Sequence, residues 1–146
     1  MKISIIFIVT LFITNCMLGQ ETNKILLGSW TKSKIEETNT LNENWLFQTS
    51  NKGIWGRTLI MTDSAIICEI KNPFTWTLTK KTELRITFGK TTCTCKARES
   101  RFEKGLDGFI KDYKSTYDNS YDKYDLQIVD NDTIKFDNLR LDRKKN

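Results

Sequence analysis

The most reactive side chains in this 146-residue chain belong to four cysteines, Cys16, Cys68, Cys93 and Cys95. Cys93 and Cys95 are two positions apart, so they share one face of the chain if their segment is an extended strand. In that geometry they are poorly placed to bond each other. We therefore expect a disulfide between Cys68 and either Cys93 or Cys95, formed in an oxidising compartment, with one thiol left over.

The chain contains no histidine. This excludes catalytic triads built on His, His metal ligands and a His proton shuttle at neutral pH. Three thiolates can bind a soft metal, but no His or nearby Met completes the set, so we expect no metal. The adjacent carboxylates of Glu36 and Glu37 would point to opposite faces of a strand, which does not suit acid–base catalysis. We expect a protein that is not an enzyme and that needs no cofactor.

Three acidic residues, Asp118, Asp122 and Asp125, lie close together in a stretch rich in tyrosine. Carboxylate oxygens are the ligands that Ca²⁺ prefers, but this spacing lacks the glycine turn and terminal glutamate of a calcium-binding loop. We interpret these residues as part of a solvated loop.

Residues 1–19 have the pattern of a secretory signal peptide, with a basic start and an apolar run too short to span a bilayer permanently. Cleavage after Gly19 would leave residues 20–146 as one domain. Alternatively, residues 13–16 resemble a bacterial lipobox, in which case Cys16 would be lipidated and retained. Both routes predict an exported protein, in the periplasm or outside the cell. The second route predicts a lipoprotein anchored in the outer membrane, and neither leaves a stable transmembrane segment.

The formal net charge of +5 is small, and acidic residues lie between the basic ones along most of the chain. This pattern is typical of a solvated surface of mixed charge. Because no nucleic-acid-binding signature accompanies the charge, we expect no nucleic-acid partner. We expect a monomer.

Short stretches that alternate between apolar and polar residues dominate the chain, and this period of two predicts half-buried strands. The clearest apolar sets are Ile66, Cys68 and Ile70; Phe74, Trp76 and Leu78; and Leu84, Ile86 and Phe88. We count eight to ten strands joined by short turns, which indicates an all-β antiparallel meander. Closing it into an up-and-down barrel removes the unpaired edges of so long a sheet.

Four other segments have distinct patterns. Five apolar or aromatic residues have helical spacing, so we predict one short helix over residues 101–113, within an insert over residues 101–122. They are Phe102, Leu106, Phe109, Ile110 and Tyr113. The polar residues 39–44 predict a turn, and Pro73 predicts a break between strands. Asn138 shifts the alternation in the last strand, as a β-bulge would.

Five short motifs, in order along residues 20–146, resemble the bacterial lipocalin-like domain family of the wider lipocalin and calycin group. They are Leu27-Gly28-Ser29-Trp30; Trp45-Leu46-Phe47 followed by Gly53; Phe74-Thr75-Trp76-Thr77-Leu78; Leu84-Arg85-Ile86; and Asp132 to Phe136 with Leu139 to Arg143. In lipocalins an Arg near the last strand packs across the Trp of the first strand. The resemblance therefore implies that Arg143, or alternatively Arg140, covers Trp30 beside Gly28, a cation–π contact worth about 0.5–2 kcal/mol.

The resemblance implies non-catalytic binding of a small apolar or amphipathic ligand in the cell envelope. Aromatic side chains on the inner face would line its pocket, namely Phe74, Trp76, Phe88 and Phe136, together with Trp30. The alternative is that these rings fill the barrel, because a barrel of about eight strands is barely wide enough for its own side chains. A filled barrel would serve as an interaction or accessory domain of the envelope.

Overall fold

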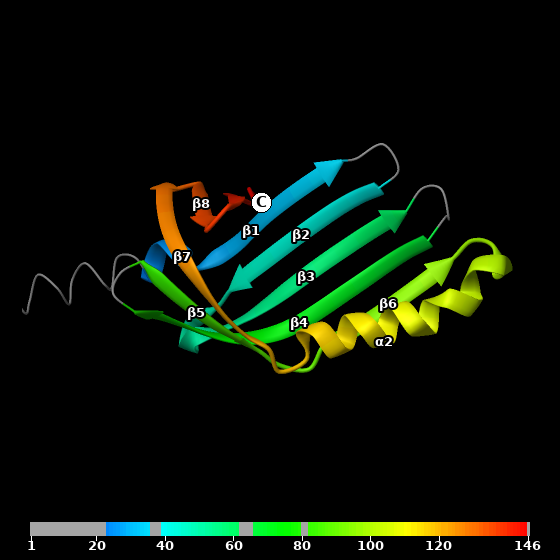
Figure 1. The fold of residues 1–146 in the computed structure, drawn as a ribbon. Helices are drawn as coiled ribbons and strands as arrows, with labels where there is room; N and C mark the ends of the chain where they lie inside the picture. Colours follow the sequence, from blue (N-terminus) through cyan, green and yellow to red (C-terminus); the bar gives the residue numbers. More distant parts are fainter. Residues whose placement is uncertain (1–22, 36–38, 62–65, 80–81, 146) are drawn as a thin grey trace, which may run out of the picture.

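The structure is a computed structural model that describes residues 23–35, 39–61, 66–79 and 82–145. The predicted signal peptide of residues 1–19, its Cys16, and the pair Glu36-Glu37 lie outside the described residues. Within them the chain forms nine strands, one helical turn at residues 23–26, two 3₁₀ segments and one longer α-helix late in the chain (Figure 1).

The strands are β1 (Gly28–Ile35), β2 (Asn39–Phe47), β3 (Lys52–Met61), β4 (Ile66–Thr79), β5 (Glu83–Phe88), β6 (Thr92–Ala97), β7 (Tyr121–Asp130), β8 (Thr133–Phe136) and β9 (Leu139–Arg143). A 3₁₀ turn, η1 (Thr49–Asn51), connects β2 to β3. A second 3₁₀ segment, η2 (Ser100–Gly105), leads directly into helix α2 (Leu106–Tyr117).

Eight of these strands close into a barrel in which every pairing is antiparallel. The sheet order is β3-β2-β1-β9-β8-β7-β5-β4, and β3 also pairs with β4, which closes the ring. Strand β6 stands outside the ring and pairs with the first half of β4. This confirms the predicted fold class, an antiparallel barrel with one helix late in the chain.

Strand β4 runs unbroken from Ile66 to Thr79, so the predicted break at Pro73 is wrong. Strand β4 continues through Pro73 because its partner on one side changes at this point. The register with β6 ends at Lys71, and the register with β5 begins at Phe74. Pro73 falls between these two partners, where no ladder bond needs its missing N–H. Its carbonyl still accepts a hydrogen bond of 2.7 Å from the backbone N–H of Gly89.

Two further local predictions are wrong. Residues 39–44 belong to β2, which pairs with β1 and β3 along this stretch, instead of forming a turn. The predicted closing strand is split at Asp137-Asn138 into β8 and β9, and the positive φ of 49° at Asp137 identifies a tight turn. The shift in alternation at Asn138 is therefore caused by a hairpin turn and not by a β-bulge. A register irregularity of this sheet lies instead in β7, between Ile128 and Asp130.

The predicted helix over residues 101–113 begins as 3₁₀ segment η2 and continues as α2 to Tyr117. It lies alongside β6, as Figure 1 shows. None of the residues of α2 is fully buried. The helix therefore covers one side of the sheet without entering the core.

Aromatic side chains fill one end of the barrel. The ring of Trp45 lies at the centre, with its centroid 5.5 to 6.4 Å from six other rings, those of Phe47, Trp55, Phe74, Phe88, Tyr124 and Phe136. Phe47 makes a further edge contact with Trp76 at 5.6 Å. The side chains predicted to line a pocket thus pack against one another at this end, which favours the filled alternative there.

The ring closes at a short seam between the first and last strands. Strand β9 pairs with β1 only at Trp30–Arg143 and Thr31–Asp142. Trp30 is completely buried, and the guanidinium carbon of Arg143 lies 4.2 Å from its ring centroid. Gly28 adopts a φ of +119° beside this guanidinium, a conformation that favours glycine. Of the two arginines that the resemblance offers, the structure thus places Arg143 on Trp30.

Candidate functional site

Strands β1 to β4 continue beyond the point at which the ring closes. On one side, β9 leaves β1 after Thr31; on the other, β5 pairs with β4 only from Phe74 onward. Figure 1 shows these four strands as a broad twisted layer that extends past β7 and β8 toward α2. We call this part the open half; it consists of residues 32–35, 39–44, 57–61 and 66–71 together with β6 and α2.

A charged cluster lies on the inner face where the open half meets the aromatic core. Arg57 pairs in register with Glu43 on β2 and with Ile70 on β4. Its guanidinium donates from Nη2 to Glu43 Oε1 at 2.7 Å and from Nη1 to the hydroxyl of Tyr113 on α2 at 2.6 Å. Its carbon lies 5.0 Å from the ring centroid of Trp55. We call Glu43, Trp55, Arg57, Tyr113 and Tyr117 the Arg57 cluster.

The ion pair of the Arg57 cluster is shielded from water. The side chain of Glu43 is 6% exposed and that of Arg57 is 23% exposed. Burial acts to lower the pKa of Arg57, but the hydrogen bond and the charge of Glu43 outweigh it, so the pKa is raised. Burial raises the pKa of Tyr113, although Arg57 opposes that shift. Arg57 therefore stays charged and Tyr113 stays neutral at physiological pH.

Three buried polar side-chain atoms in the described part of the chain have no hydrogen-bond partner: Trp45 Nε1, Arg57 Nε and Asn72 Oδ1. Trp45, Trp55 and Asn72 form one row across β2, β3 and β4, and Arg57 stands on the same face in the next row. A buried polar atom left unpaired costs about 1–3 kcal/mol. Such atoms point to a place where a bound molecule or an internal water completes the hydrogen bonding.

Beyond the Arg57 cluster the inner face becomes apolar. Leu59 and Met61 follow Arg57 on β3 at inward positions, opposite Cys68 and Ile66 of β4. A cavity of about 310 Å³ then lies between these strand ends and the start of the helical segment, lined by Met61, Ile66, Arg101, Phe102, Gly105, Leu106 and Phe109. Met61 is four residues from Arg57, which is about 13 Å along a strand.

The four side chains predicted to bind a ligand are each at most 3% exposed. Phe74 and Phe88 also border a surface cavity of about 550 Å³ beside Gly53, Pro73 and Gly89. Trp76 and Phe136 do not line this cavity, so it brings together only two of the four. Their binding of a ligand remains a prediction.

Arg57 and Glu43 were not among the residues predicted from the sequence, although the sequence carries a signal for Arg57. Trp55 is an obvious inward position, and Arg57 follows it two residues later in the same strand, so the alternation places a charge inside the barrel. A charge in such a place needs a partner or a ligand.

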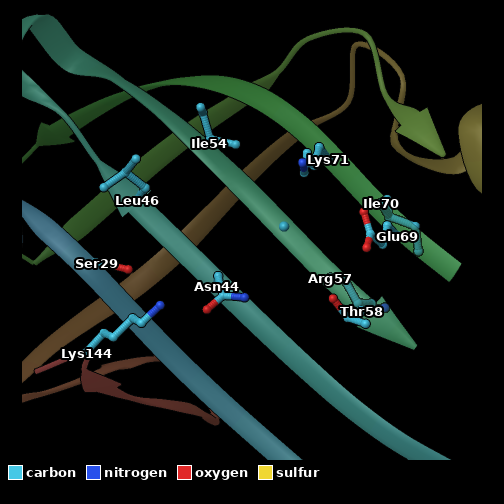
Figure 2. A pocket seen from close by; sticks show the side chains of 11 residues that line it. Ser29, Asn44, Leu46, Ile54, Arg57, Thr58, Glu69, Ile70, Lys71 and Lys144 are labelled. Atoms are coloured by element: carbon cyan, nitrogen blue, oxygen red, sulfur yellow. The ribbon is translucent and has the colours of Figure 1, made fainter. Parts of the chain in front are cut away.

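The outer surface of the same layer carries a shallow groove of about 310 Å³ around Gly56 (Figure 2). Because Gly56 has no side chain, the groove crosses β1 to β4 at this point. Its walls are mostly polar and charged, with Asn44, Glu69, Lys71 and Lys144 among them, while Leu46 and Ile54 supply the apolar part.

The cysteines resolve the open pairing: Cys68 is bonded to Cys95, and Cys93 is a free thiol. The three aspartates predicted to lie in one solvated loop do not: Asp118 follows the end of α2, whereas Asp122 and Asp125 belong to β7. Asp118 accepts a hydrogen bond from the backbone N–H of Thr91, and Asp122 accepts one from the hydroxyl of Tyr124. Among residues 23–35, 39–61, 66–79 and 82–145, no three acidic, Cys or His side chains are grouped to hold a metal.

In the same ranges no helix has the length and apolarity needed to cross a bilayer. A comparison of the sequence with models of protein families and with curated proteins finds no match.

Proposed function

We propose that this chain is a non-catalytic binding protein for a small amphipathic anion, held in the open half of the barrel. One observation carries the proposal. The guanidinium of Arg57 lies on the inner face with a buried N–H that no group in the described part of the chain accepts. The Arg57 cluster is therefore incomplete as a purely structural ion pair, and an anionic oxygen is the natural partner for that N–H.

The head group of the ligand would meet Arg57 and the indole N–H of Trp45, the two unpaired donors. Glu43 keeps Arg57 in place and partly cancels its charge, so the ligand must compete with one carboxylate. Lys32 stands opposite Glu43 in the β1–β2 register and adds a positive charge to the same face. The local balance thus favours a monoanion such as a carboxylate.

The tail of the ligand would lie along Leu59 and Cys68 toward the cavity bordered by Met61 and Phe102. Burying an acyl chain there gains about 0.8 kcal/mol per methylene. Because α2 is only partly buried, its movement away from the sheet is a simple route of entry.

The test is a fluorescence titration with two probes, the anionic 11-(dansylamino)undecanoate and the neutral N-phenyl-1-naphthylamine. Arg57→Gln should weaken the anionic probe by about 10- to 100-fold, because a hydrogen bond to a charged group contributes about 1.5–3 kcal/mol. Glu43→Gln should tighten the same probe, because it removes the competing carboxylate. The neutral probe should respond little to either change.

Arg140→Gln is the matched control, since Arg140 is an exposed arginine on β9 that pairs with Asp142. Unfolding midpoints in urea confirm that each variant is folded before it is titrated. If wild type binds neither probe, the proposed function fails. If both probes bind and Arg57→Gln weakens neither, the barrel binds a ligand but Arg57 does not hold its head group.

The second candidate function is an interaction domain, favoured by the filled aromatic end and by the outer groove of Figure 2. Gly56→Leu tests it, because a side chain added there first meets the carbonyl oxygen of Ile70, at an ordinary 3.8 Å. The variant should fold and bind probes as wild type does. Loss of a partner from chemical cross-links in whole cells would support this candidate, whereas an unchanged cross-link pattern would contradict it.

We place either function in the cell envelope on the strength of residues 1–19. The intact mass of protein recovered from its own cells tests this. A mass that begins at Gln20, or a lipidated chain that begins at Cys16, supports export, and an intact Met1 terminus contradicts it.

A further inference from the structure

Three sulfur atoms lie together between β4, β6 and α2. Cys68 and Cys95 face each other across the β4–β6 ladder and are bonded, with their Cα atoms 4.1 Å apart. The free thiol of Cys93, two residues earlier on β6, lies 3.9 Å from the sulfur of Cys95. Cys68 is completely buried, while Cys93 and Cys95 are half-buried.

We propose that Cys68, Cys93 and Cys95 form a thiol–disulfide exchange site through which small thiols reach a buried disulfide. In the first step the thiolate of Cys93 attacks the sulfur of Cys95. The Cys68–Cys95 bond breaks, a Cys93–Cys95 bond forms, and Cys68 leaves as a thiolate that takes up the proton Cys93 released. No electrons are gained or lost, so this step needs no oxidant.

The second step uses an external low-molecular-weight thiol. Its thiolate attacks Cys93 in the rearranged disulfide, forms a mixed disulfide there, and releases the Cys95 thiolate. A second thiol molecule then attacks the mixed disulfide, which frees Cys93 and leaves as a small disulfide. The net result is a protein with three free thiols and one oxidised pair of small thiols. Rearrangement matters because it moves the bond from buried Cys68 onto the two half-buried sulfurs.

The position of β6 makes the rearrangement feasible. Residues two apart on a strand have Cα atoms about 6.6 Å apart, near the upper limit of about 6.8 Å for a disulfide. A slight bend of the strand at Thr94 brings this distance to the usual value of about 5.5–6 Å. Within the described residues β6 has one strand partner, β4, and its main other contacts are with α2 and η2. An edge strand of this kind can bend without disturbing the closed ring.

The rate of disulfide exchange depends on how readily the Cys93 thiol loses its proton in its surroundings. Burial raises the pKa of its thiol, and Lys114 on α2 partly opposes this shift. Across the ladder, Cys93 faces Ile70, which carries no charge. The reactive thiolate is therefore scarce at neutral pH, and exchange should accelerate as the pH rises.

Peptide mapping tests the first step on the full chain as purified. Tryptic cleavage separates residues 58–71, which carry Cys68, from residues 91–96, which carry Cys93 and Cys95. The protein is incubated at neutral or mildly alkaline pH, and free thiols are then blocked with N-ethylmaleimide in acidic denaturant. Exchange releases residues 91–96 alone, as an internal disulfide two hydrogen atoms lighter than the dithiol, together with blocked Cys68. If the two peptides remain joined at every pH, the step does not occur.

Reduction kinetics test the second step, with glutathione as the external thiol. We expect Cys93→Ser and Cys93→Ala to lose the Cys68–Cys95 bond about tenfold more slowly than wild type, because the entry route is gone. Two different substitutions of Cys93 are compared, so that a structural defect caused by one of them does not decide the result. Cys16→Ser in the unprocessed chain is the control and should react as wild type does. Equal rates for wild type and both Cys93 variants would overturn the proposal.

Discussion

Replacing Arg143 with methionine should destabilise the barrel far more than the same change at the exposed Arg140. The guanidinium donates to three backbone carbonyls: Nη1 to Leu27 at 3.0 Å, Nη2 to Ile25 at 2.7 Å and Nε to Asn131 at 2.9 Å. It also lies on the ring of Trp30. One side chain therefore joins the segment before β1, the β7–β8 turn and the core at the seam.

The magnitude follows from these contacts. The cation–π contact contributes about 1 kcal/mol. Each hydrogen bond contributes about 1 kcal/mol net, the lower part of the range for charged donors, because the side chain is 28% exposed and the carbonyls regain some water. The sum is about 3–4 kcal/mol, a large share of the roughly 5–15 kcal/mol that stabilises a typical domain. The melting temperature should fall by about 10 °C or more.

Urea unfolding followed by tryptophan fluorescence measures this loss. Arg143→Lys should lose about 2 kcal/mol, because a lysine keeps the charge but cannot reproduce the fork of donors. Arg140→Met is the matched control. The Arg140 side chain is 60% exposed and forms a surface ion pair with Asp142, so the change should stay within about 0.5 kcal/mol. If Arg143→Met costs no more than Arg140→Met, strand pairing alone holds the seam and the reasoning is wrong.

Two other predictions concern the substitution of glycines in β3 and the titration of Glu83. Gly53→Ala should cost about 1–3 kcal/mol, because the new methyl group would overlap the ring of Phe74. Gly56→Ala should change the free energy of unfolding by less than about 1 kcal/mol, because its methyl group would make only an ordinary contact of 3.8 Å with the carbonyl oxygen of Ile70. Glu83 should titrate with a pKa of about 2, because a hydrogen bond from Arg85 favours the carboxylate. Its folded pKa is depressed, so its contribution to stability is complete above the unfolded pKa and is lost as the pH falls toward 2; carboxyl chemical shifts in NMR check the midpoint.

The alternating segments were predictable from the sequence because the physics that forms them is local. The apolar sets of residues 66–70 and 74–78 both alternate, and the structure buries the expected face of β4 from Ile66 to Trp76. Pro73 misled the prediction because a proline ends a strand only where a neighbour needs its N–H. Whether one does depends on where β5 and β6 begin and end, and no local pattern shows that.

Residues 39–44 were predicted to form a turn, but they belong to strand β2. Their side chains favour turns, yet pairing with β1 on one side and β3 on the other keeps them extended. The pairing energy of two neighbouring strands exceeds the small intrinsic preference of polar residues for turns.

The Arg57 cluster was beyond local reasoning for a similar cause. Its inward position follows from the alternation in β3, but its partners lie 14 residues away in Glu43 and 56 residues away in Tyr113. Only the packing of α2 against the sheet decides that Tyr113 reaches the guanidinium. The disulfide was narrowed to two choices because both candidate cysteines share one face, and the β4–β6 register then selects Cys95.

The seam between β1 and β9 also determines when this protein can fold. Its pairs join residues that are more than 110 positions apart, as the hydrogen bond from Thr31 to the carbonyl of Asp142 shows. A ribosome must therefore release nearly the whole chain before the ring can close, and until then β1 presents an unpaired edge. Barrels dominated by such distant contacts fold slowly, in about milliseconds to seconds. During that interval the newly made chain is open to wrong strand pairing, so its last few residues govern its yield as well as its stability.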